Sequence, residues 1–490
     1  MSQPLILAID AGSSFLKTVV FDRAGQIVGR TRLPYVTRRR APGLAEQDPD
    51  TWLDLTVESV AQLRRAGIEL DQIAGLGLSG RGALAIFLDA AGRALAPCWL
   101  DRRSGDAARA LAERVGADLD YQTRSLASKT YHLKLNHPDA FARLARPLFL
   151  KDFLLYRLTG AAATDPSSVI SATGWPKNVW EAVGFPVEQL APIRQHTEIG
   201  GTLSGRMADR LGLPVGLPVG VGGHDGACAN AGAGAIRPGQ ICLTMGTQGV
   251  ARAIAAAPPD NARPRRISPY PFLPGRWCCS GDLVLAGAAP TLVARLLDPG
   301  PSTTNQALHE RFTAAARAVP SGANGVIYLP FPGGQVSPDL RRDARAALIG
   351  MSAETTPAEL YRAALEGVAF AFRSVVERER EVGLALDDIR LTGGGAENEL
   401  WVQIMADVLN APLTIVEPEE GARGAAMFLA VGLGWFGSPE EAADAWVRPV
   451  RRVEPGGDAV TYGHAYRRFR RLADAVYVAE SSVDARGEPR

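Results

Sequence analysis

Apolar and polar positions along the chain form two similar hairpin patterns, one at the start of the chain and one near its middle. The first has an apolar strand over Leu5–Ile9, a short polar turn and a second strand over Thr18–Phe21. The second has a strand over Ile241–Leu243, a turn rich in Gly and Thr, and a strand over Val250–Ile254. Such turns present backbone N–H groups and hydroxyls, which suit phosphate oxygens. One turn in each half predicts a nucleotide clamped between two related domains.

The first half alternates apolar strands with amphipathic helices. A helix is predicted over 49–65, because Trp52, Leu55 and Val60 recur at helical spacing after Asp48-Pro49. Further segments follow, with strands at 73–79 and 83–88 and helices at about 104–115, 138–145 and 150–158. This alternation predicts an α/β fold.

The second half repeats the alternation after a segment rich in Pro and Gly, residues 214–239. Its clearest helix begins at Thr356–Glu359, where Thr, Pro and Glu form a capping box, and its apolar positions on two sides predict burial. A strand over Ile389–Thr392 leads into Gly393–Gly395 and a helix from about Glu397. We therefore predict an N-terminal domain over 1–236, a C-terminal domain over 237–480 and a disordered polar tail over 481–490.

Composition narrows the class of protein. The chain has 490 residues, 46% of them hydrophobic, and 53 basic side chains balance 52 acidic ones. This balance gives no reason to expect binding to nucleic acid or to an anionic membrane. The five cysteines show no disulfide spacing, and neither a leader nor an apolar run of about 18 residues is evident. We expect a cytoplasmic enzyme that is neither exported nor membrane-spanning.

Two nucleotide-binding patterns can be set aside. Gly75–Gly80 matches the dinucleotide pattern G-x-G-x-x-G, but that fingerprint needs a helix to follow, and Ala83–Leu88 is predicted as a strand. The P-loop pattern G-x-x-x-x-G-K-[ST] does not occur. A Rossmann site and a P-loop are therefore not expected.

The segment Gly222–Gly226 is the most suggestive for chemistry. Asp225 follows the apolar strand Val219–Val221 in a glycine-rich turn at the predicted domain junction, where it can serve as a base. The alternative is that Asp225 caps a helix beginning near Ala227, since Asp is a favoured N-cap residue. Local sequence leaves both interpretations open. His224 is predicted to pack or hydrogen-bond rather than to bind a metal, because no partner lies at ligand spacing.

The Gly393–Gly395 loop suits close approach of a nucleotide, although glycines also let a strand turn sharply into a helix. Each hairpin alone is equally unspecific. The two hairpins together with an acidic junction are more informative.

With these motifs the chain resembles the FGGY carbohydrate kinases of the actin/hexokinase-like ATPase superfamily, from about Leu5 to about Gly434. Ala346–Met351 and, after seven residues, Glu359–Glu366 satisfy the family's C-terminal signature position by position. Further matches are Asp10–Ser14, Glu46–Pro49, Asp101–Arg103, Lys151-Asp152, Gly246–Gly249, Gly393–Ala396 and Leu400-Trp401.

This resemblance implies two ribonuclease-H-like domains that flank a central cleft. It also implies ATP and Mg²⁺ as cofactors, and it gives Asp225 the role of the base that takes the proton of the attacking sugar hydroxyl. The resemblance also implies that Asp10 and Asp225 support magnesium through water. The residues implied for the nucleotide are Asp10, Gly12, Ser13, Ser14, Lys17, Gly246, Thr247, Gln248, Gly394, Gly395 and Asn398. Those implied for the sugar are Ser79, Arg81, Gly82, His224 and Asp225.

The chain departs from its relatives mainly where the sugar is recognised. Many xylulose kinases have G-Q-M-H-G where this chain has Ser79–Gly82, and the Arg-Glu pair of glycerol kinases is absent there. His132 replaces an expected tryptophan, and Gln335 stands in a loop that usually reads G-E-R-x-P. These positions leave the kinase interpretation intact and argue against glycerol.

We therefore expect an ATP-dependent kinase for a primary hydroxyl of a small sugar, such as the ketopentose xylulose. Kinases for L-fuculose, L-ribulose or erythritol are the nearest alternatives. A non-catalytic sugar sensor on the same scaffold is an alternative from another class. The expected partners are the sugar and ATP, and a homodimer is left open.

Overall fold

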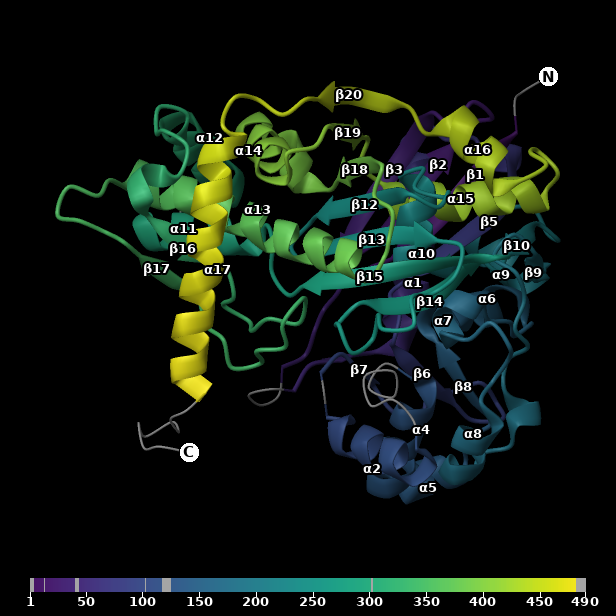
Figure 1. Ribbon diagram of the computed structural model, residues 1–490. Helices are drawn as coiled ribbons and strands as arrows, with labels where there is room; N and C mark the ends of the chain where they lie inside the picture. The colour runs from purple at the N-terminus through teal and green to yellow at the C-terminus, as the bar shows by residue number, and fades with distance from the viewer. Residues whose placement is uncertain are drawn as a thin grey trace. The chain divides into compact units, whose positions relative to one another are not determined.

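The structure is a computed structural model that describes residues 4–12, 14–39, 44–101, 103–116, 125–300 and 303–481. The chain forms two compact units (Figure 1). The first comprises Met1–Ile236, Tyr270–Arg276 and Glu419–Val447, and the second comprises the segments between and after these. The chain first passes from the first unit to the second after Ile236, and it later returns to the first unit twice.

The first unit is built on a mixed sheet in the order β3-β2-β1-β5-β10-β9. Its strands are β1 (Leu5–Ala11), β2 (Phe15–Phe21), β3 (Ile27–Pro34), β4 (Glu46–Gln47), β5 (Ile73–Gly80), β6 (Ala85–Leu88), β7 (Cys98–Trp99), β8 (Arg146–Phe149), β9 (Ile199–Thr202), β10 (Pro218–Gly220) and β11 (Gly223–His224). Its helices are α1 (Pro49–Arg65), α2 (Gly105–Val115), α4 (Leu126–Asn136), α5 (Pro138–Ala142), α6 (Leu150–Thr159), α7 (Pro166–Val169), α8 (Lys177–Val183), α9 (Gly205–Leu211), α10 (Asp225–Gly232), α15 (Glu420–Gly432) and α16 (Pro439–Trp446).

The second unit has a sheet with the strand order β15-β13-β12-β18-β19-β20. Its strands are β12 (Gln240–Met245), β13 (Gly249–Ala255), β15 (Arg276–Leu283), β16 (Ile327–Leu329), β17 (Ala347–Ile349), β18 (Asp388–Thr392), β19 (Leu413–Val416) and β20 (Pro449–Val453), and β14 (Ser268–Leu273) lies where the chain returns to the first unit. Its helices are α11 (Ala288–Leu297), α12 (Asn305–Ala316), α13 (Pro357–Glu381), α14 (Glu399–Leu409) and α17 (Ala459–Ser481).

The two sheets share one topology. In each, an antiparallel hairpin is followed by a parallel neighbour: β1 pairs with β2 and with β5, and β12 pairs with β13 and with β18. A third antiparallel strand extends each hairpin, and an antiparallel strand closes the opposite edge. The α/β fold with two related halves, predicted from the repeated hairpins, is confirmed.

Most predicted elements are present with small changes at their ends. The helix predicted over 49–65 is α1, and Asp48 caps it by accepting from the Asp50 N–H. The strand predicted from Ala83 begins at Ala85, because Ala83 has a left-handed φ of 60° that does not fit a strand. The helix predicted from Glu397 begins at Glu399 after a 3-10 turn. The predicted tail lies almost wholly outside the described residues.

The glycines of the G-x-G-x-x-G pattern serve packing between a helix and the sheet. A Cβ atom at Gly77 would lie 2.7 Å from the carbonyl oxygen of Ala425 in α15, and one at Gly75 would lie 2.9 Å from the carbonyl oxygen of Pro218. After β5 the chain continues into strand β6 rather than into a helix. The Rossmann interpretation, which the sequence disfavoured, is therefore excluded for this segment.

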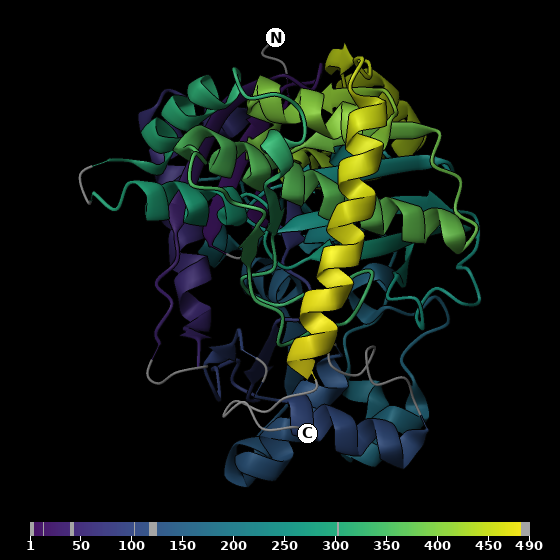
Figure 2. The same ribbon diagram turned by 60° about the vertical axis from the view of Figure 1, so that its left-hand side comes forward.

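The core of the second unit is organised around α13. Thr356 and Glu359 form the predicted capping box, and apolar residues on both sides of the helix are buried. Figure 2 shows the long helix α17, which contributes Tyr462, Tyr466 and Phe469 to the same core. The Arg362 guanidinium donates to the Tyr462 hydroxyl at 2.7 Å and to Glu366 at 2.8 Å. These contacts fix α17 against α13.

Glu379 in α13 is a buried acid without a hydrogen-bond partner. Its exposed fraction is 0%, and neither carboxyl oxygen is hydrogen-bonded within the described ranges. Burial raises the pKa of Glu379 well above its ordinary value of 4.5, and Asp282 raises it further against the opposing effect of Arg380. Burial therefore favours the protonated form of this side chain in the folded chain.

Replacing Glu379 by glutamine is expected to stabilise the protein increasingly as the pH rises. The folded chain binds the Glu379 proton more tightly than the unfolded chain does, so this group's contribution to stability is complete below pH 4.5 and is lost as the pH rises through the higher folded pKa. Thermal unfolding from pH 5 to 9 measures the effect. Glu381→Gln, on the same helix but half exposed, is the control and should leave the pH dependence unchanged. If the melting temperatures of wild type and Glu379→Gln differ by the same amount at every pH, the prediction is contradicted.

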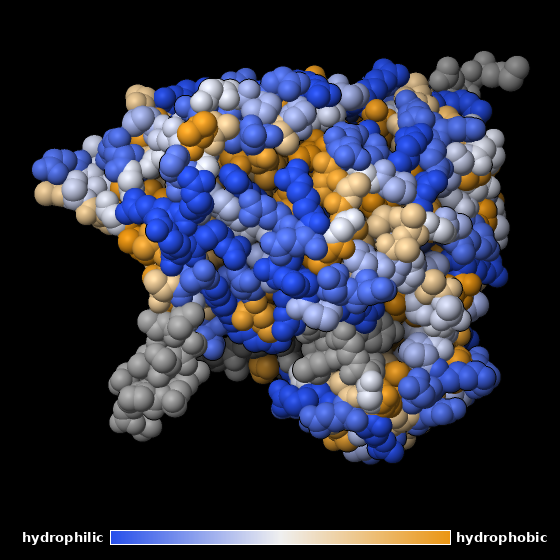
Figure 3. Space-filling view, viewed as in Figure 1, coloured by the Kyte–Doolittle hydropathy of each residue, from blue (hydrophilic) through white to orange (hydrophobic). Residues whose placement is uncertain are grey.

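The face in Figure 3 is largely hydrophilic, with apolar residues scattered over it. Within the described ranges, no helix combines the length and the apolar character that crossing a membrane requires.

Candidate active site

Strand register gathers three predicted site residues at one edge of the first sheet. Asp10 in β1 lies opposite Ser79 in β5, and Gly223 in β11 also lies opposite Ser79. Asp225 follows β11 directly as the first residue of α10. Because β1, β5 and β11 are parallel, their carboxyl ends meet there, which is where α/β sheets bind ligands.

Asp10 is a buried carboxylate with a polar environment. Its exposed fraction is 8%, and the Ser79 hydroxyl donates to Oδ1 at 2.8 Å. The pKa of Asp10 is raised to about 6, chiefly by burial; Lys17 and the Ser79 hydroxyl oppose this increase, and the charges of Asp225 and Glu420 add to it. A Cβ atom at Gly421 would lie 2.7 Å from Oδ2, so only glycine leaves this oxygen room. Two other acids are thus within electrostatic reach of Asp10, which favours a cation beside it.

Lys17 pairs with an acid that sequence analysis missed. It lies across the hairpin from Asp10, and its Nζ is 3.1 Å from Glu419 Oε2. Glu419 precedes α15 and has a left-handed φ of 69°. The predicted role of Lys17 at the phosphates stays a prediction. Glu419 reaches Lys17, and Glu420 and Gly421 reach Asp10, from a segment far along the sequence, so no local spacing could reveal them.

Asp225 is the first residue of α10 but does not cap that helix. His224 is the N-cap residue of α10, and its Nδ1 accepts from the Ala227 N–H at 2.9 Å. The interpretation of Asp225 as the cap of a helix beginning near Ala227 is therefore wrong. Asp225 Oδ1 instead accepts from the N–H groups of Gly226 at 2.9 Å and Gly82 at 3.4 Å. The carboxylate is held by backbone donors and is not committed to an ion pair among the described residues.

The surroundings of Asp225 include the residues predicted for the sugar. A Cβ atom at Gly82 would lie 3.3 Å from the His224 ring, so the two residues are in close contact. The Tyr270 ring meets the same imidazole edge-on at 4.5 Å between centroids. Tyr270 belongs to one of the segments that return to the first unit, and sequence analysis missed it.

Two cations near this loop form no ion pair in the described part of the chain. Lys129 is 6% exposed, and its Nζ makes one hydrogen bond, to the Trp99 carbonyl at 3.5 Å. Burial lowers the pKa of Lys129, and Arg81 and Arg103 lower it further against the opposing effects of Cys98 and Asp101. Arg81 donates its backbone N–H to Ala11, but its side chain forms no ion pair there. His132, which stands where the family resemblance predicts a tryptophan, packs edge-on against Trp99 with 5.0 Å between ring centroids.

Two motifs of the family resemblance meet in a structural clamp. Arg103 forms ion pairs with Asp101 at 2.6 Å and with Glu46 at 2.7 Å, and Asp101 accepts from the Ala45 N–H at 2.7 Å. These contacts outweigh the effect of burial and lower the pKa of Asp101 to about 2. The clamp ties the segment before α1 to β7, with which β4 pairs. Its charges are satisfied internally.

The second unit brings its two predicted nucleotide loops together. Parallel pairing of β12 with β18 places Thr244 opposite Thr392, so the turn after β12 lies beside Gly393. A Cβ atom at Gly393, whose φ is 91°, would lie 2.8 Å from the carbonyl of Met245 and 3.1 Å from the Gly246 nitrogen. Thr247 and Gln248 are exposed at this edge. Gly393 is therefore required by the backbone contact between the two loops, and the close approach of a nucleotide to this loop stays a prediction.

The other residues predicted to bind the nucleotide differ in how much of their surroundings is already occupied. A Cβ atom at Gly394 would meet nothing within 4 Å. Asn398 is the N-cap of α14: its Oδ1 accepts from Trp401 at 3.2 Å and its Nδ2 donates to Thr313 at 2.8 Å. Its two polar ends are thus engaged, and its predicted contact with adenosine stays a prediction. In the first hairpin, the Gly12 N–H donates to Phe15 and Ser14 is exposed, while Ser13 lies outside the described residues.

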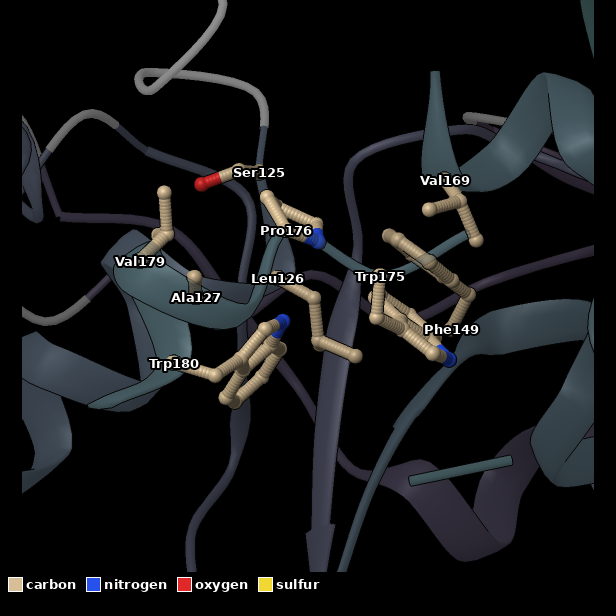
Figure 4. A pocket seen from close by; sticks show the side chains of 9 residues that line it. All are labelled: Ser125, Leu126, Ala127, Phe149, Val169, Trp175, Pro176, Val179 and Trp180. Carbon is tan, nitrogen blue, oxygen red and sulfur yellow. The ribbon is translucent and has the colours of Figure 1, made fainter. Parts of the chain in front are cut away.

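Figure 4 shows a small apolar cavity elsewhere in the first unit. Its lining residues are Ser125, Leu126, Ala127, Phe149, Val169, Trp175, Pro176, Val179 and Trp180. Trp175 stacks on Phe149 at 6.4 Å and meets Trp180 edge-on at 5.7 Å. None of the predicted site residues lines it. We interpret this cavity as a packing gap among aromatic side chains.

Metal ligands are sparse in the site. Within the described ranges, no three His, Cys, Asp or Glu side chains are arranged to hold a metal ion. Magnesium keeps several waters and often takes only one or two carboxylates beside substrate phosphates. The buried Asp10, with Asp225 and Glu420 within electrostatic reach, fits a magnesium ion bound in that way.

Comparison with known proteins identifies the family. The profile of the FGGY family of carbohydrate kinases, N-terminal domain, matches residues 5–232, and that of the C-terminal domain matches residues 242–433. A xylulose kinase of Bacillus subtilis (strain 168) is 28% identical, with 92% of each chain covered. An L-xylulose/3-keto-L-gulonate kinase of Escherichia coli (strain K12) is 27% identical, covering 96% of this chain and 97% of the relative.

Solved structures agree with this result. The crystal structure of a xylulose kinase from Rhodospirillum rubrum is 26% identical, with a TM-score of 0.84 over 96% of this chain and 99% of that one. Matching profiles over both halves and a shared fold along nearly the whole chain leave one conclusion. The chain belongs to the FGGY family of carbohydrate kinases.

Proposed function

We propose that the protein transfers the γ-phosphoryl group of ATP to a primary hydroxyl of a ketopentose such as xylulose, with Asp225 as the general base. The observation that carries this proposal is the meeting of Asp10, Ser79 and Asp225 at the carboxyl ends of parallel strands. Phosphoryl transfer asks a protein mainly for positioning and for stabilisation of charge. The N–H groups of Gly226 and Gly82 fix the position of the Asp225 carboxylate, and a general base must be positioned in this way.

The chemical step divides among residues of the first unit. Asp225 removes the proton of the sugar hydroxyl as its oxygen attacks the γ-phosphorus, and the bond from that phosphorus to the oxygen of the departing ADP breaks. Asp10, oriented by the Ser79 hydroxyl, holds the carboxylate charge beside which magnesium would bind through water. Magnesium, when bound, neutralises negative charge on the phosphates. Lys17 and the first hairpin turn are assigned to the same phosphates.

The nucleotide is assigned to the second unit. Gly246, Thr247 and Gln248 present backbone and hydroxyl donors at the turn after β12. Gly393 closes that turn against the next loop, where Gly394 has room beside it for a ligand. Gly394, Gly395 and Asn398 are therefore proposed to border the adenosine.

The proposed identity of the sugar rests on the names of the relatives and on the loop after β5. Relatives that cover nearly the whole chain carry the name xylulose kinase. Gly82 and His224 lie in contact beside Asp225, which leaves the substrate loop compact. Arg81 and Ser79 flank the same turn. Together they favour a small sugar over a large one.

Lys129 and Arg81, which form no ion pair with any described residue, favour a second candidate, a ketose that carries a carboxylate. An ammonium as buried as that of Lys129 is costly without a counter-charge. Arg81, at the loop that contacts Asp225, adds a second positive charge. A relative of 27% identity is named for both L-xylulose and 3-keto-L-gulonate. A carboxylate on the substrate would compensate these charges, which a neutral pentulose cannot do.

A coupled ADP-release assay over a panel of sugars tests the proposal. The panel should contain D- and L-xylulose, L-ribulose, L-fuculose, erythritol, glycerol and ketoses ending in a carboxylate. We expect the highest kcat/KM with a xylulose enantiomer if the first candidate holds, and with a carboxylate ketose if the second does. Binding of ATP and sugar without ADP release from any member would instead support a sensor. Preference for glycerol would contradict both candidates.

A further inference from the structure

A cluster of fully buried polar side chains lies in the first unit outside the proposed catalytic residues. We call it the Asp165 cluster; its members are Lys151, Asp165, Ser167, Ser168 and His196. Asp165 caps α7, pairs with Lys151 Nζ at 2.9 Å, and accepts from the Ser168 hydroxyl at 2.6 Å and the Ser167 hydroxyl. His196 Nε2 lies 3.2 Å from Asp165 and 3.1 Å from Ser167. A charged cluster of this kind is costly to bury unless its geometry is well satisfied.

The cluster is not a hydrolytic triad, although it contains Ser, His and Asp. In such a triad the acid holds one imidazole nitrogen and the serine the other. Here Asp165 and Ser167 both lie on His196 Nε2, while Nδ1 has no hydrogen-bond partner among the described residues. Ser167 is also fully buried, so no substrate can reach its hydroxyl. A role for the cluster must therefore be sought in what it touches.

The cluster touches the backbone that leads into Asp225. The His224 N–H donates to the Ser167 hydroxyl at 3.4 Å, and the Gly222 N–H donates to the His196 carbonyl at 3.2 Å. A Cβ atom at Gly223 would lie 2.8 Å from the His196 ring. Strand β5 also packs closely on the cluster, because a Cβ atom at Gly80 would lie 2.9 Å from Lys151 Cβ. Residues 222–224 are thus fixed between β5 and the cluster.

We propose that Asp165 is a positioning residue: through Ser167 and His196 it fixes residues 222–224 and thereby the direction of the Asp225 carboxylate. The proposal rests on the proposed function, in which Asp225 is the base. The charge of Asp165 orients both intermediaries, since it accepts from the Ser167 hydroxyl and holds the His196 Nε2–H. A displacement of about 1 Å at a reacting group can cost on the order of 10²-fold in rate.

Two serines provide a matched test. Ser167 and Ser168 both donate their hydroxyls to Asp165 and are both buried, but only Ser167 reaches His196 and the His224 N–H. We expect Ser167→Ala to lower kcat about 10- to 100-fold while KM for ATP and for sugar changes less than about twofold. Ser168→Ala should leave kcat within about twofold. Melting temperatures of both variants separate this effect from a general loss of stability.

Two acids provide a second test. Asp152 also pairs with Lys151 but has no hydrogen bond to Ser167 or His196 among the described contacts. Asp165→Asn retains a good N-cap side chain and loses the charge. We expect Asp165→Asn to lower kcat at least tenfold more than Asp152→Asn does.

The outcomes separate this inference from the proposed function. Equal kcat values for Ser167→Ala and Ser168→Ala, or equal losses for the two acid variants, would overturn the positioning role. If Asp225→Asn is inactive in the same assay, the base assignment survives that result. If Asp225→Asn is active, the proposed function itself fails, whatever the cluster variants show.

Discussion

Asp225→Asn is expected to lower sugar-dependent ADP release by about 10²–10⁴-fold, because an amide cannot take the proton of the attacking hydroxyl. The amide oxygen can still accept from the Gly226 and Gly82 N–H groups, so the turn before α10 should keep its geometry. ATP binding should therefore change little. Steady-state ADP release with the best sugar, together with the dissociation constant for ATP, measures both parts.

A second aspartate supplies the control. Asp48 caps α1 and accepts from the Asp50 N–H at 3.1 Å, and asparagine is an equally good cap. Asp48→Asn should retain wild-type turnover and stability. Near wild-type turnover in Asp225→Asn would refute the base assignment, whereas loss of ATP binding in that variant would indicate a structural role for the carboxylate.

Elements governed by local signals could be predicted from the sequence. The helix α1 has the predicted bounds, because Asp48, Pro49 and the spacing of apolar residues all act within a few residues of one another. The capping box of α13 is equally local. Both hairpins follow from short apolar strands around polar turns. The pairings that place Asp10 beside Ser79 and Gly246 beside Gly393 join segments far apart along the chain and do not follow from these local signals.

Contacts between distant segments could not be predicted in the same way. The chain returns to the first unit at Glu419, where Glu419 pairs with Lys17 and Gly421 borders Asp10. The apolar pattern of that segment predicts a buried helix but does not identify the sheet that it covers. Tyr270 beside His224 is a similar case.

The Asp165 cluster shows a further reason why sequence is insufficient. Its members lie in three separate segments, and only the Asp165-Pro166-Ser167 capping pattern is visible locally. Lys151-Asp152 is a family match without a physical role until the fold pairs Lys151 with Asp165. For Asp225, the choice between cap and base depended on which residue begins α10, and sequence reasoning cannot fix a helix end to one residue.

Gly424→Ala is expected to lower the free energy of unfolding by about 1–3 kcal/mol and to reduce activity. The added Cβ atom would push apart two helices that carry site residues. A Cβ atom at Gly424 in α15 would lie 1.9 Å from the Cys228 carbonyl oxygen in α10, and one at Gly232 in α10 would lie 1.8 Å from the Glu420 carbonyl oxygen. Both contacts are to backbone, so no side chain can move aside. The helices must shift, and with them Asp225 at the start of α10 and Gly421 beside Asp10.

A glycine in another helix separates this effect from helix propensity. Gly463 lies in α17, and a Cβ atom there would meet only the end of the Arg467 side chain at 3.8 Å. Gly463→Ala should therefore stabilise the protein by about 0.5–1 kcal/mol, since alanine favours a helix over glycine. Urea unfolding of both variants gives the two free-energy changes. Equal stabilisation by Gly424→Ala would show that α10 and α15 are not in backbone contact, and the account of how α15 supports Asp10 would then fail.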